Sequence, residues 1–435
     1  MSLLMVKPLP RRTVAVLSLT GITACKLLVL LLLLKAGYVQ PYVSNGAHNL
    51  FLSAANNILT TGTYNDPGTS SYSKIAPGYA VFLALAQWIG ARWYLSLVVC
   101  LQMLLDYCVA LLLLFLGNRE TSIEAGWLAG VLWLVFPPAV VISTWVTSET
   151  LFTMLLVLSM VMLIRSLSQQ GGVGLSFAAG LTLGVTTLVR GTTQLLPVFC
   201  FAISCFQGIP KRLLKCTLFL IGMCLLVLPW TLRNLYVLGE PIIVQTGFGE
   251  VFLEGSRSEY FTSEAMARSY PVLSRQAAEE GLVQPTDRKA TSEDRWNFHL
   301  GLREYRIRLE QEPLSFFPLI IHKFARLWYG MDTGIFYKQL MLGICSLLIV
   351  PIGIFQIWLW RRDHQNLSIL GILALYFVIL AVVSLPQLRY TISLYPFLIF
   401  SASHQYIKLF KVLRMKPLEG FSLNSLRFVA RGKVR

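Results

Sequence analysis

Charged residues are scarce in this sequence. Of its 435 residues, 13% are Asp, Glu, Lys or Arg and 55% are hydrophobic. Soluble domains carry about 25% charged residues, so this chain has too little charge to cover a surface in water. The length leaves room for roughly 10 to 13 membrane-spanning helices of about 20 residues each. We therefore predict an all-α polytopic membrane protein.

Paired cysteines are also missing. The eight cysteines lie in or beside apolar stretches, and no two are spaced as a CxxC pair. This pattern argues against a disulfide framework or a zinc site. No set of metal ligands is predicted, and the residues require no cofactor. Binding of a divalent cation is left as an alternative.

The positive charge is distributed unevenly. The formal net charge is +16, but the segment from Thr231 to Leu340 holds 14 acidic and 13 basic residues, a net charge of −1, and the rest of the chain carries +17. Lys and Arg concentrate on the cytoplasmic side of membrane proteins. We predict a multi-pass protein of the plasma membrane, here the bacterial inner membrane, with both termini in the cytoplasm. Its middle segment then lies outside, and nucleic acid is not expected as a partner.

These shifts in composition divide the chain into four parts. The predicted parts are an N-terminal transmembrane module (1–230) with a first outer loop (38–75), an outer, periplasmic loop domain (231–334) with an interfacial helix (313–329), C-terminal transmembrane helices (335–407) and a basic cytoplasmic tail (408–435).

The sequence predicts where several apolar helices begin and end. A single segment is expected at 125–142, and the run that starts at 216 is expected to end at Pro229. The segments at 174–189 and 192–206 are short and meet at Arg190. An arginine at the centre of one long apolar helix would be costly, so two helices hinged at the outer surface are predicted instead.

Carboxylates outside the middle segment are few enough to stand out. Asp66 is the only acid in the first 105 residues. It is a candidate base, although Asn, Asp, Pro and Gly in succession at 65–68 also predict a simple turn. His48 in the same loop is a second proton acceptor near neutral pH, or an interfacial histidine without a chemical role. Glu149 opens an outer helix end, where helix capping is the alternative reading. Asp106, in mid-helix, is expected to pair with a polar neighbour.

Six cations are placed by this topology at the outer membrane edge. They are Lys74, Arg190, Arg233, Lys323, Arg326 and Arg389. Such residues can anchor lipid headgroups in general. Because six on one face oppose the positive-inside trend, they favour a site for an anionic lipid phosphate.

A series of short motifs resembles one enzyme family. Pro229-Trp230 with Arg233-Asn234, followed by glycines at 239, 247, 249 and 255, is similar to the signature of bacterial polyprenyl-phosphate-sugar glycosyltransferases. These are GT-C membrane enzymes of the family 39 and aminoarabinose-transferase type, related to protein mannosyltransferases. Five further motifs occur in the same order, at 54–64, 74–79, 136–150, 180–190 and 389–396.

The resemblance implies a fold and an activity. The expected fold is a GT-C bundle with a mixed outer-face loop domain. The expected function is inverting transfer of a sugar from a polyprenyl-phosphate donor to an envelope glycan, lipid or protein acceptor at the outer face. A lipid-linked sugar flippase or polymerase, or a non-catalytic GT-C relative, is the alternative. One departure favours the last, because Asn45 or Ala47 stands where the family has a first-loop acid.

Candidate site residues follow from these arguments. The predicted catalytic residues are Asp66, His48 and Glu149. The predicted ligands of the lipid phosphate and sugar are Lys74, Arg190, Trp230, Arg233, Asn234, Glu254, Lys323, Arg326, Arg389 and Tyr390.

Overall fold

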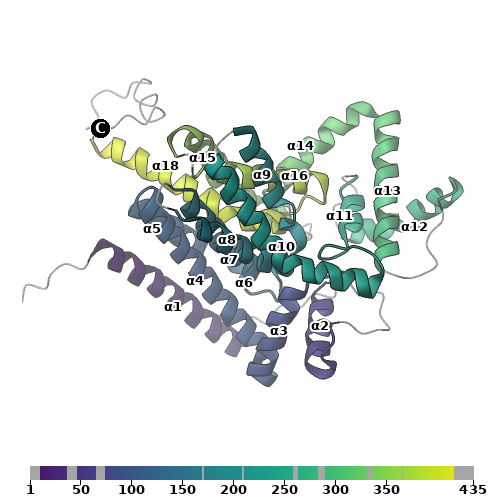
Figure 1. Ribbon diagram of the computed structural model, residues 1–435, viewed down its shortest axis with the longest axis horizontal. Coiled ribbons are helices and arrows are strands. Elements are labelled where there is room, and N and C mark those ends of the chain that lie inside the picture. The colour runs from purple at the N-terminus through teal and green to yellow at the C-terminus, as the bar shows by residue number, and fades with distance from the viewer. Residues whose placement is uncertain are drawn as a thin grey trace, which may run out of the picture.

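The computed structural model describes residues 10–36, 47–64, 74–168, 171–207, 210–257, 263–282, 290–330, 336–364 and 366–415. Every regular element in these ranges is a helix, which confirms the predicted all-α class. The elements form a main bundle and a smaller group of helices that projects from one end of it (Figure 1).

The main bundle is built from the apolar helices. These are α1 (Arg11–Lys35), α3 (Pro77–Gly90), α4 (Tyr94–Glu120), α5 (Ile123–Val135), α6 (Pro137–Ser143), α7 (Glu149–Leu167), α8 (Val173–Val189), α9 (Leu196–Gln207), α10 (Pro210–Leu238), α15 (Phe336–Asp363), α16 (Ile369–Val383) and α18 (Tyr395–Met415). The short helices α2 (Ala47–Thr61) and α17 (Leu388–Thr391) lie beside it.

The projecting group comes from the segment of soluble composition. It consists of α11 (Phe248–Glu254), α12 (Ser263–Glu279), α13 (Ala290–Gln311) and α14 (Phe316–Arg326). Leu253 of α11, Leu273 and Ala277 of α12, and Trp296 and Leu300 of α13 form its small apolar core. Helix α14 lies within the stretch predicted to be an interfacial helix.

Five helices among the described residues are long and apolar enough to cross a membrane, or six if the bent pair α5 and α6 forms one span. Three further apolar helices are shorter, at 173–189, 191–205 and 369–383. Length and composition thus identify fewer spans than the 10 to 13 predicted. The difference arises because several predicted segments are short or bent helices. The chain is a multi-pass membrane protein.

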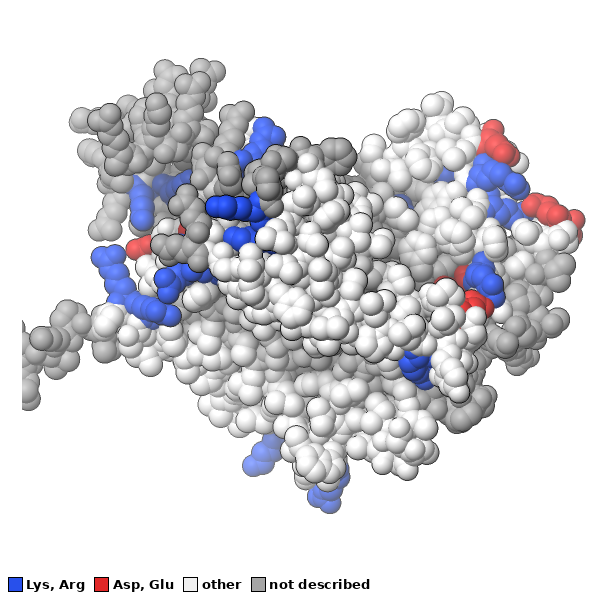
Figure 2. Space-filling view, in the orientation of Figure 1, with Lys and Arg blue, Asp and Glu red and all other residues white. Residues whose placement is uncertain are grey.

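The distribution of charge on the surface is consistent with a membrane protein. On the face drawn in Figure 2, charged side chains gather at the end that holds the start of α1 and the end of α18, over the projecting helices and at one lower edge. The broad surface between them is uncharged. An apolar band bounded by charge is what a bilayer requires of a protein surface.

Two details of the bundle correct the sequence prediction. The segment expected at 125–142 is two helices, which meet at Pro137 with a bend of 55°. Helix α10 does not end at Pro229 but continues to Leu238. The residues after Pro229 are held by loop carbonyls, as described below, and these tertiary contacts outweigh the local helix-breaking effect of proline.

A third detail confirms a prediction. The carboxylate of Asp106 on α4 lies 3.0 Å from the ammonium of Lys26 on α1. Asp106 therefore pairs with a polar neighbour inside the bundle, and the pair ties the largely lipid-exposed helix α1 to the core.

Candidate active site

A charged cluster lies where α7 begins and α8 ends. The guanidinium of Arg190 lies 2.9 Å from the carboxylate of Glu149, and both side chains are mostly buried. Arg190 also stacks on the ring of Tyr390, 5.1 Å from its centre. Arg389 stacks on the same ring at 5.1 Å and donates a hydrogen bond to its hydroxyl at 3.1 Å. Three of the predicted ligands and one predicted catalytic residue are thus brought together from α7, α8 and α17.

Local backbone explains the position of this cluster. Helix α8 ends at Val189, and Arg190 has an extended conformation that turns the chain into a single 3-10 turn, Gly191–Thr193, before α9. The predicted hinge at Arg190 is confirmed. Ser148, directly before α7, makes no side-chain capping bond. Glu149 begins α7 and also pairs with Arg190, so its carboxylate has a contact beyond the helix start.

A second cluster surrounds the end of α10. The indole nitrogen of Trp230 donates to the Val244 carbonyl at 3.0 Å, and the buried Asn234 amide donates to the Ile242 carbonyl at 2.9 Å. The guanidinium of Arg233 lies over the Trp230 ring at 4.9 Å and donates to the Asn234 side chain at 3.1 Å. The Pro-Trp-x-x-Arg-Asn run therefore ties α10 to the following loop and leaves Arg233 stacked on an aromatic face.

Tyr64 completes this cluster, and sequence reasoning did not single it out. Its ring meets Trp230 edge-on at 5.0 Å and lies 5.8 Å from the Arg233 guanidinium. Burial raises the pKa of the Tyr64 hydroxyl far above its usual range, against the opposing effect of Arg233. Tyr64 is the last residue of the motif at 54–64, and this position in the motif could have identified it from the sequence.

The two clusters lie on the same end of the bundle. A side chain at Gly191 would lie 3.5 Å from Val244, whose carbonyl binds Trp230. Gly78, four residues after Lys74, packs so closely on the Val189 backbone that a Cβ there would lie 2.9 Å from the Val189 nitrogen. The motifs containing Lys74, Arg190 and Trp230 therefore converge in space.

Lys74 contacts the projecting helices. Its ammonium lies 3.2 Å from the carboxylate of Glu293 on α13. The neighbouring Asp294 accepts backbone hydrogen bonds from Gly247 at 2.9 Å and Gly249 at 2.8 Å. Burial raises the pKa of Asp294, and these two N–H groups oppose the rise.

The backbone structure requires glycine at positions 247 and 249. Gly247 has a left-handed φ of 105°, and a Cβ on Gly249 would lie 1.9 Å from the Asp294 carbonyl oxygen. Glu293 and Asp294 were not predicted, because nothing in the local sequence of α13 indicates which loop it contacts.

Lys323 occupies a buried position. Its ammonium donates to the Gly255 carbonyl at 3.0 Å and to the Tyr305 hydroxyl at 3.1 Å, and Tyr305 donates to the same carbonyl at 3.0 Å. Burial lowers the pKa of Lys323 to about 7. Lys323 thus links α14 to the projecting helices, and its role as a phosphate ligand stays a prediction.

The remaining predicted residues are placed as follows. Glu254 ends α11 directly before Gly255, and Arg326 is buried at the end of α14. Asp66 lies outside the described residues, as does the side chain of His48. In the described part of the chain, no group of three His, Cys, Asp or Glu residues could hold a metal ion.

Comparison with known proteins gives no match from sequence alone. No protein-family model matches the chain, and no curated protein does.

Solved structures do match. One is the archaeal oligosaccharyltransferase AglB from Archaeoglobus fulgidus in complex with an inhibitory peptide and a dolichol-phosphate, with a TM-score of 0.50, 13% identity and coverage of 88% of this chain and 49% of that one. Another is the Archaeoglobus fulgidus oligosaccharyltransferase tethered to an acceptor peptide, with a TM-score of 0.54 and 14% identity. This match covers 98% of this chain and 52% of that one. The chain has the GT-C fold. It spans about half the length of the oligosaccharyltransferase it matches.

A third structure is ArnT from Cupriavidus metallidurans bound to undecaprenyl phosphate. It gives a TM-score of 0.42, 13% identity and coverage of 96% of this chain and 84% of that one.

Proposed function

We propose that this protein is a membrane glycosyltransferase that moves a sugar from a polyprenyl-phosphate donor to an acceptor at the outer face of the membrane. The observation that carries the proposal is the convergence of Lys74, Arg190, Arg233 and Arg389 on one end of a GT-C bundle. Charged residues at a membrane edge pair with opposite charges or mark a ligand site, and four cations gathered at one end suit an anionic ligand.

The cations suit the chemistry of a phosphate leaving group. In the proposed step, the bond between the anomeric carbon and the phosphate oxygen breaks, and its electron pair stays on the phosphate. Cations aimed at that oxygen stabilise the developing charge. Arg389 is the first candidate, because its side chain is exposed and lies beside Arg190 on the Tyr390 ring. Lys74 and Arg233 are the other candidates.

The acceptor hydroxyl supplies the new bond. Its oxygen attacks the anomeric carbon from the face opposite the leaving group, so the configuration inverts, and its proton passes to a general base. We assign the base to Asp66, with His48 as the alternative. Glu149 is assigned a positioning role, because its ion pair fixes Arg190 against Tyr390.

The neighbouring structures support the donor class. The archaeal oligosaccharyltransferase was solved with a dolichol-phosphate and with an acceptor peptide. A lipid-linked donor here fits an apolar bundle whose cations lie at its end. The acceptor is proposed as an envelope glycan, lipid or protein.

The test is a transfer assay in membranes with radiolabelled polyprenyl-phosphate sugars. Removing one donor to a developing oxyanion typically slows turnover about 100-fold or more, so Arg389→Ala should lose at least that much. Arg92→Ala is the matched control, because Arg92 is also exposed and stacks on the aromatic ring of Trp93, 5.1 Å from its centre. Asp66→Asn should abolish transfer. If wild-type protein transfers no sugar from any such donor, the proposed function is wrong; if Arg389→Ala keeps full activity, only the assigned site is wrong.

A further inference from the structure

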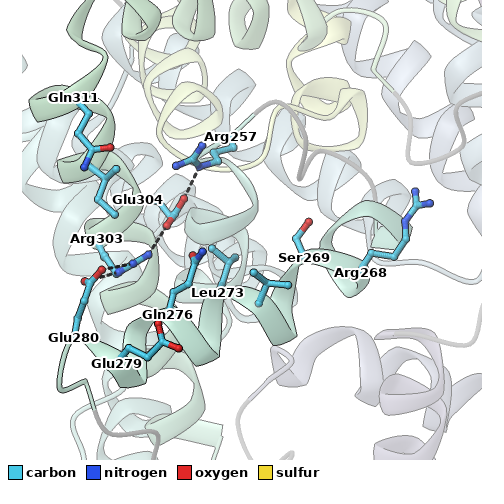
Figure 3. Close-up of a pocket in the computed structure, with 12 residues that line it drawn as sticks. Arg257, Arg268, Ser269, Leu273, Gln276, Glu279, Glu280, Arg303, Glu304 and Gln311 are labelled. Atoms are coloured by element: carbon cyan, nitrogen blue, oxygen red, sulfur yellow. Dashed lines mark hydrogen bonds and ion pairs between the residues drawn. The ribbon is translucent and has the colours of Figure 1, made fainter.

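A pocket of about 730 Å³ opens between α12 and α13 of the projecting helices (Figure 3). Small-molecule sites usually have volumes of about 300 to 1,000 Å³. This pocket lies apart from the cation clusters described above, and the proposed transfer step uses none of its side chains.

One wall of the pocket is a chain of ion pairs. Figure 3 shows Arg257, Glu304, Arg303 and Glu280 joined in succession. Arg303 donates to Glu304 at 2.8 Å and to Glu280 at 2.7 Å, while Arg257 pairs with the other oxygen of Glu304. Glu304 is only 2% exposed and Arg303 only 8%. The buried pair of Arg303 and Glu304 holds the centre of this wall in one arrangement, which preorganises it for a ligand, while Glu280 and Arg257 at its ends are partly exposed.

The opposite wall, on α12, presents the uncharged residues Leu273 and Gln276 together with the charged residues Arg268 and Glu279. Leu273 and Gln276 of α12 lie across from the ion pairs (Figure 3). The described lining contains three arginines and three glutamates, so its formal charge is zero. A phosphate-rich ligand would meet three carboxylates, and a lysine-rich peptide would meet three guanidinium groups. A neutral ligand rich in hydroxyl groups can donate to the carboxylates and accept from the guanidinium groups at once.

The position of the pocket relates it to the proposed transfer site. Helix α13 links the two: Glu304 lines the pocket, and the next residue, Tyr305, contacts Gly255 and Lys323. Gly255 in turn packs against Ser384, five residues before Arg389, since a Cβ on Gly255 would lie 2.5 Å from the Ser384 carbonyl oxygen. The pocket and the cations are therefore joined by packed contacts that run through α13, Gly255 and the residues before α17.

We propose that the pocket between α12 and α13 binds a neutral saccharide portion of the acceptor, at a distance from the hydroxyl that receives the transferred sugar. The role of this saccharide as part of the acceptor rests on the proposed function. Its binding to the pocket does not. The hydrogen-bonding lining selects a neutral saccharide over an anionic one, and the pocket thereby contributes to acceptor choice without taking part in the bond change.

The test measures binding to the full chain in lipid nanodiscs without any donor. The probes are neutral oligosaccharides of hexose and N-acetylhexosamine units, with phosphorylated versions of the same sugars for comparison. Neutral probes should bind. Gln276→Trp, which fills the pocket, should weaken binding at least tenfold. Arg275→Trp is the matched control, because Arg275 is exposed on the same helix but does not line the pocket.

The outcomes separate this inference from the proposed function. Equal binding by wild type and Gln276→Trp, binding of phosphorylated probes alone, or no binding of any probe would overturn the pocket assignment. Because the assay needs no turnover, a protein that binds neutral saccharides but transfers no sugar would overturn the proposed function and leave the pocket assignment intact.

Discussion

At the scale of single residues, the pair of Glu149 and Arg190 has two roles that experiment can separate. The pair is mostly buried, so each charge compensates the other. Removing one partner of a buried pair costs about 3–5 kcal/mol, whereas replacing both by apolar residues is often neutral. The stability of the fold should therefore depend on the balance of the pair, whereas the proposed function requires the charge itself.

We predict that Arg190→Met lowers the thermal midpoint in detergent strongly, because Glu149 is left buried without its ion-pair partner. The double variant Arg190→Met with Glu149→Leu should recover most of the midpoint but show no sugar transfer. Thermal unfolding and the transfer assay, run on the same preparations, check both parts. A double variant with full activity would show that the pair is structural only.

Lys323 gives a prediction about pH. Burial lowers the pKa of Lys323 from 10.5 to about 7, so between these values the unfolded chain binds a proton that the folded chain does not. The free energy of unfolding should therefore rise with pH in this window, by at most about 1.4 kcal/mol per unit, and should be lowest below pH 7. Lys323→Met should be more stable than wild type at pH 6, and the difference should shrink toward pH 9.

The control for this titration is Lys35→Met, since Lys35 is exposed at the end of α1. It should leave the pH dependence of wild type unchanged. Thermal midpoints measured from pH 6 to pH 9 provide the comparison. If Lys323→Met keeps the wild-type slope, the titrating group lies elsewhere.

Residue-level prediction from sequence succeeded where physical scarcity was the signal. A carboxylate in an apolar helix must find a partner, and Asp106 does so with Lys26. Cations assigned to one membrane edge were predicted to form a phosphate site, and two of them, Arg190 and Arg389, meet on Tyr390. Contacts made by the projecting helices, such as that of Glu293 with Lys74, were not predictable because polar residues are common there.

At the scale of the helices, close packing between α8 and α10 depends on glycine. A Cβ on Gly180 would lie 2.2 Å from the Phe219 carbonyl oxygen, and one on Gly222 would lie 2.4 Å from that of Phe177. Small residues allow membrane helices to approach closely, where van der Waals contacts replace the hydrophobic effect. Arg190 at the end of α8 and Trp230 near the end of α10 are thus set at a fixed separation.

We predict that Gly180→Ala disrupts this packing, because the added methyl group meets backbone that cannot move aside. The yield of monodisperse protein on size-exclusion chromatography and its thermal midpoint should both fall. Gly174→Ala is the control in the same helix, since nothing lies within 4 Å of its added Cβ. Alanine favours helix over glycine by about 1 kcal/mol, so this control should be neutral or stabilising. Equal behaviour of the two variants would contradict the packing argument.

Helix positions were largely predictable because apolar length and charged ends mark them. The hinge at Arg190 and the start of α7 at Glu149 follow the sequence pattern. The continuation of α10 past Pro229 did not, because it depends on hydrogen bonds to carbonyls in a loop whose path the local sequence does not specify. The bend at Pro137 was missed because the flanking residues form one continuous apolar run.

At the scale of the whole molecule, the charged groups mark two ends. Arg11 pairs with Glu124, and Glu120 pairs with Arg165, at the ends of α1, α5, α4 and α7 that lie away from the cation clusters. The opposite end carries those clusters and the projecting helices. A polarised molecule of this kind has one orientation in the membrane that satisfies the positive-inside rule.

This orientation gives the last prediction. Gln276→Cys on α12 should react with a membrane-impermeant maleimide in intact cells, whereas Lys411→Cys near the end of α18 should react only after lysis. Both positions are exposed, so a difference in labelling reports their side of the membrane and not their burial. Wild-type protein sets the background, since its eight cysteines lie in or beside apolar stretches. The opposite pattern would place the cation clusters on the cytoplasmic side, and the donor, the acceptor and the pocket would then have to be sought among cytoplasmic compounds.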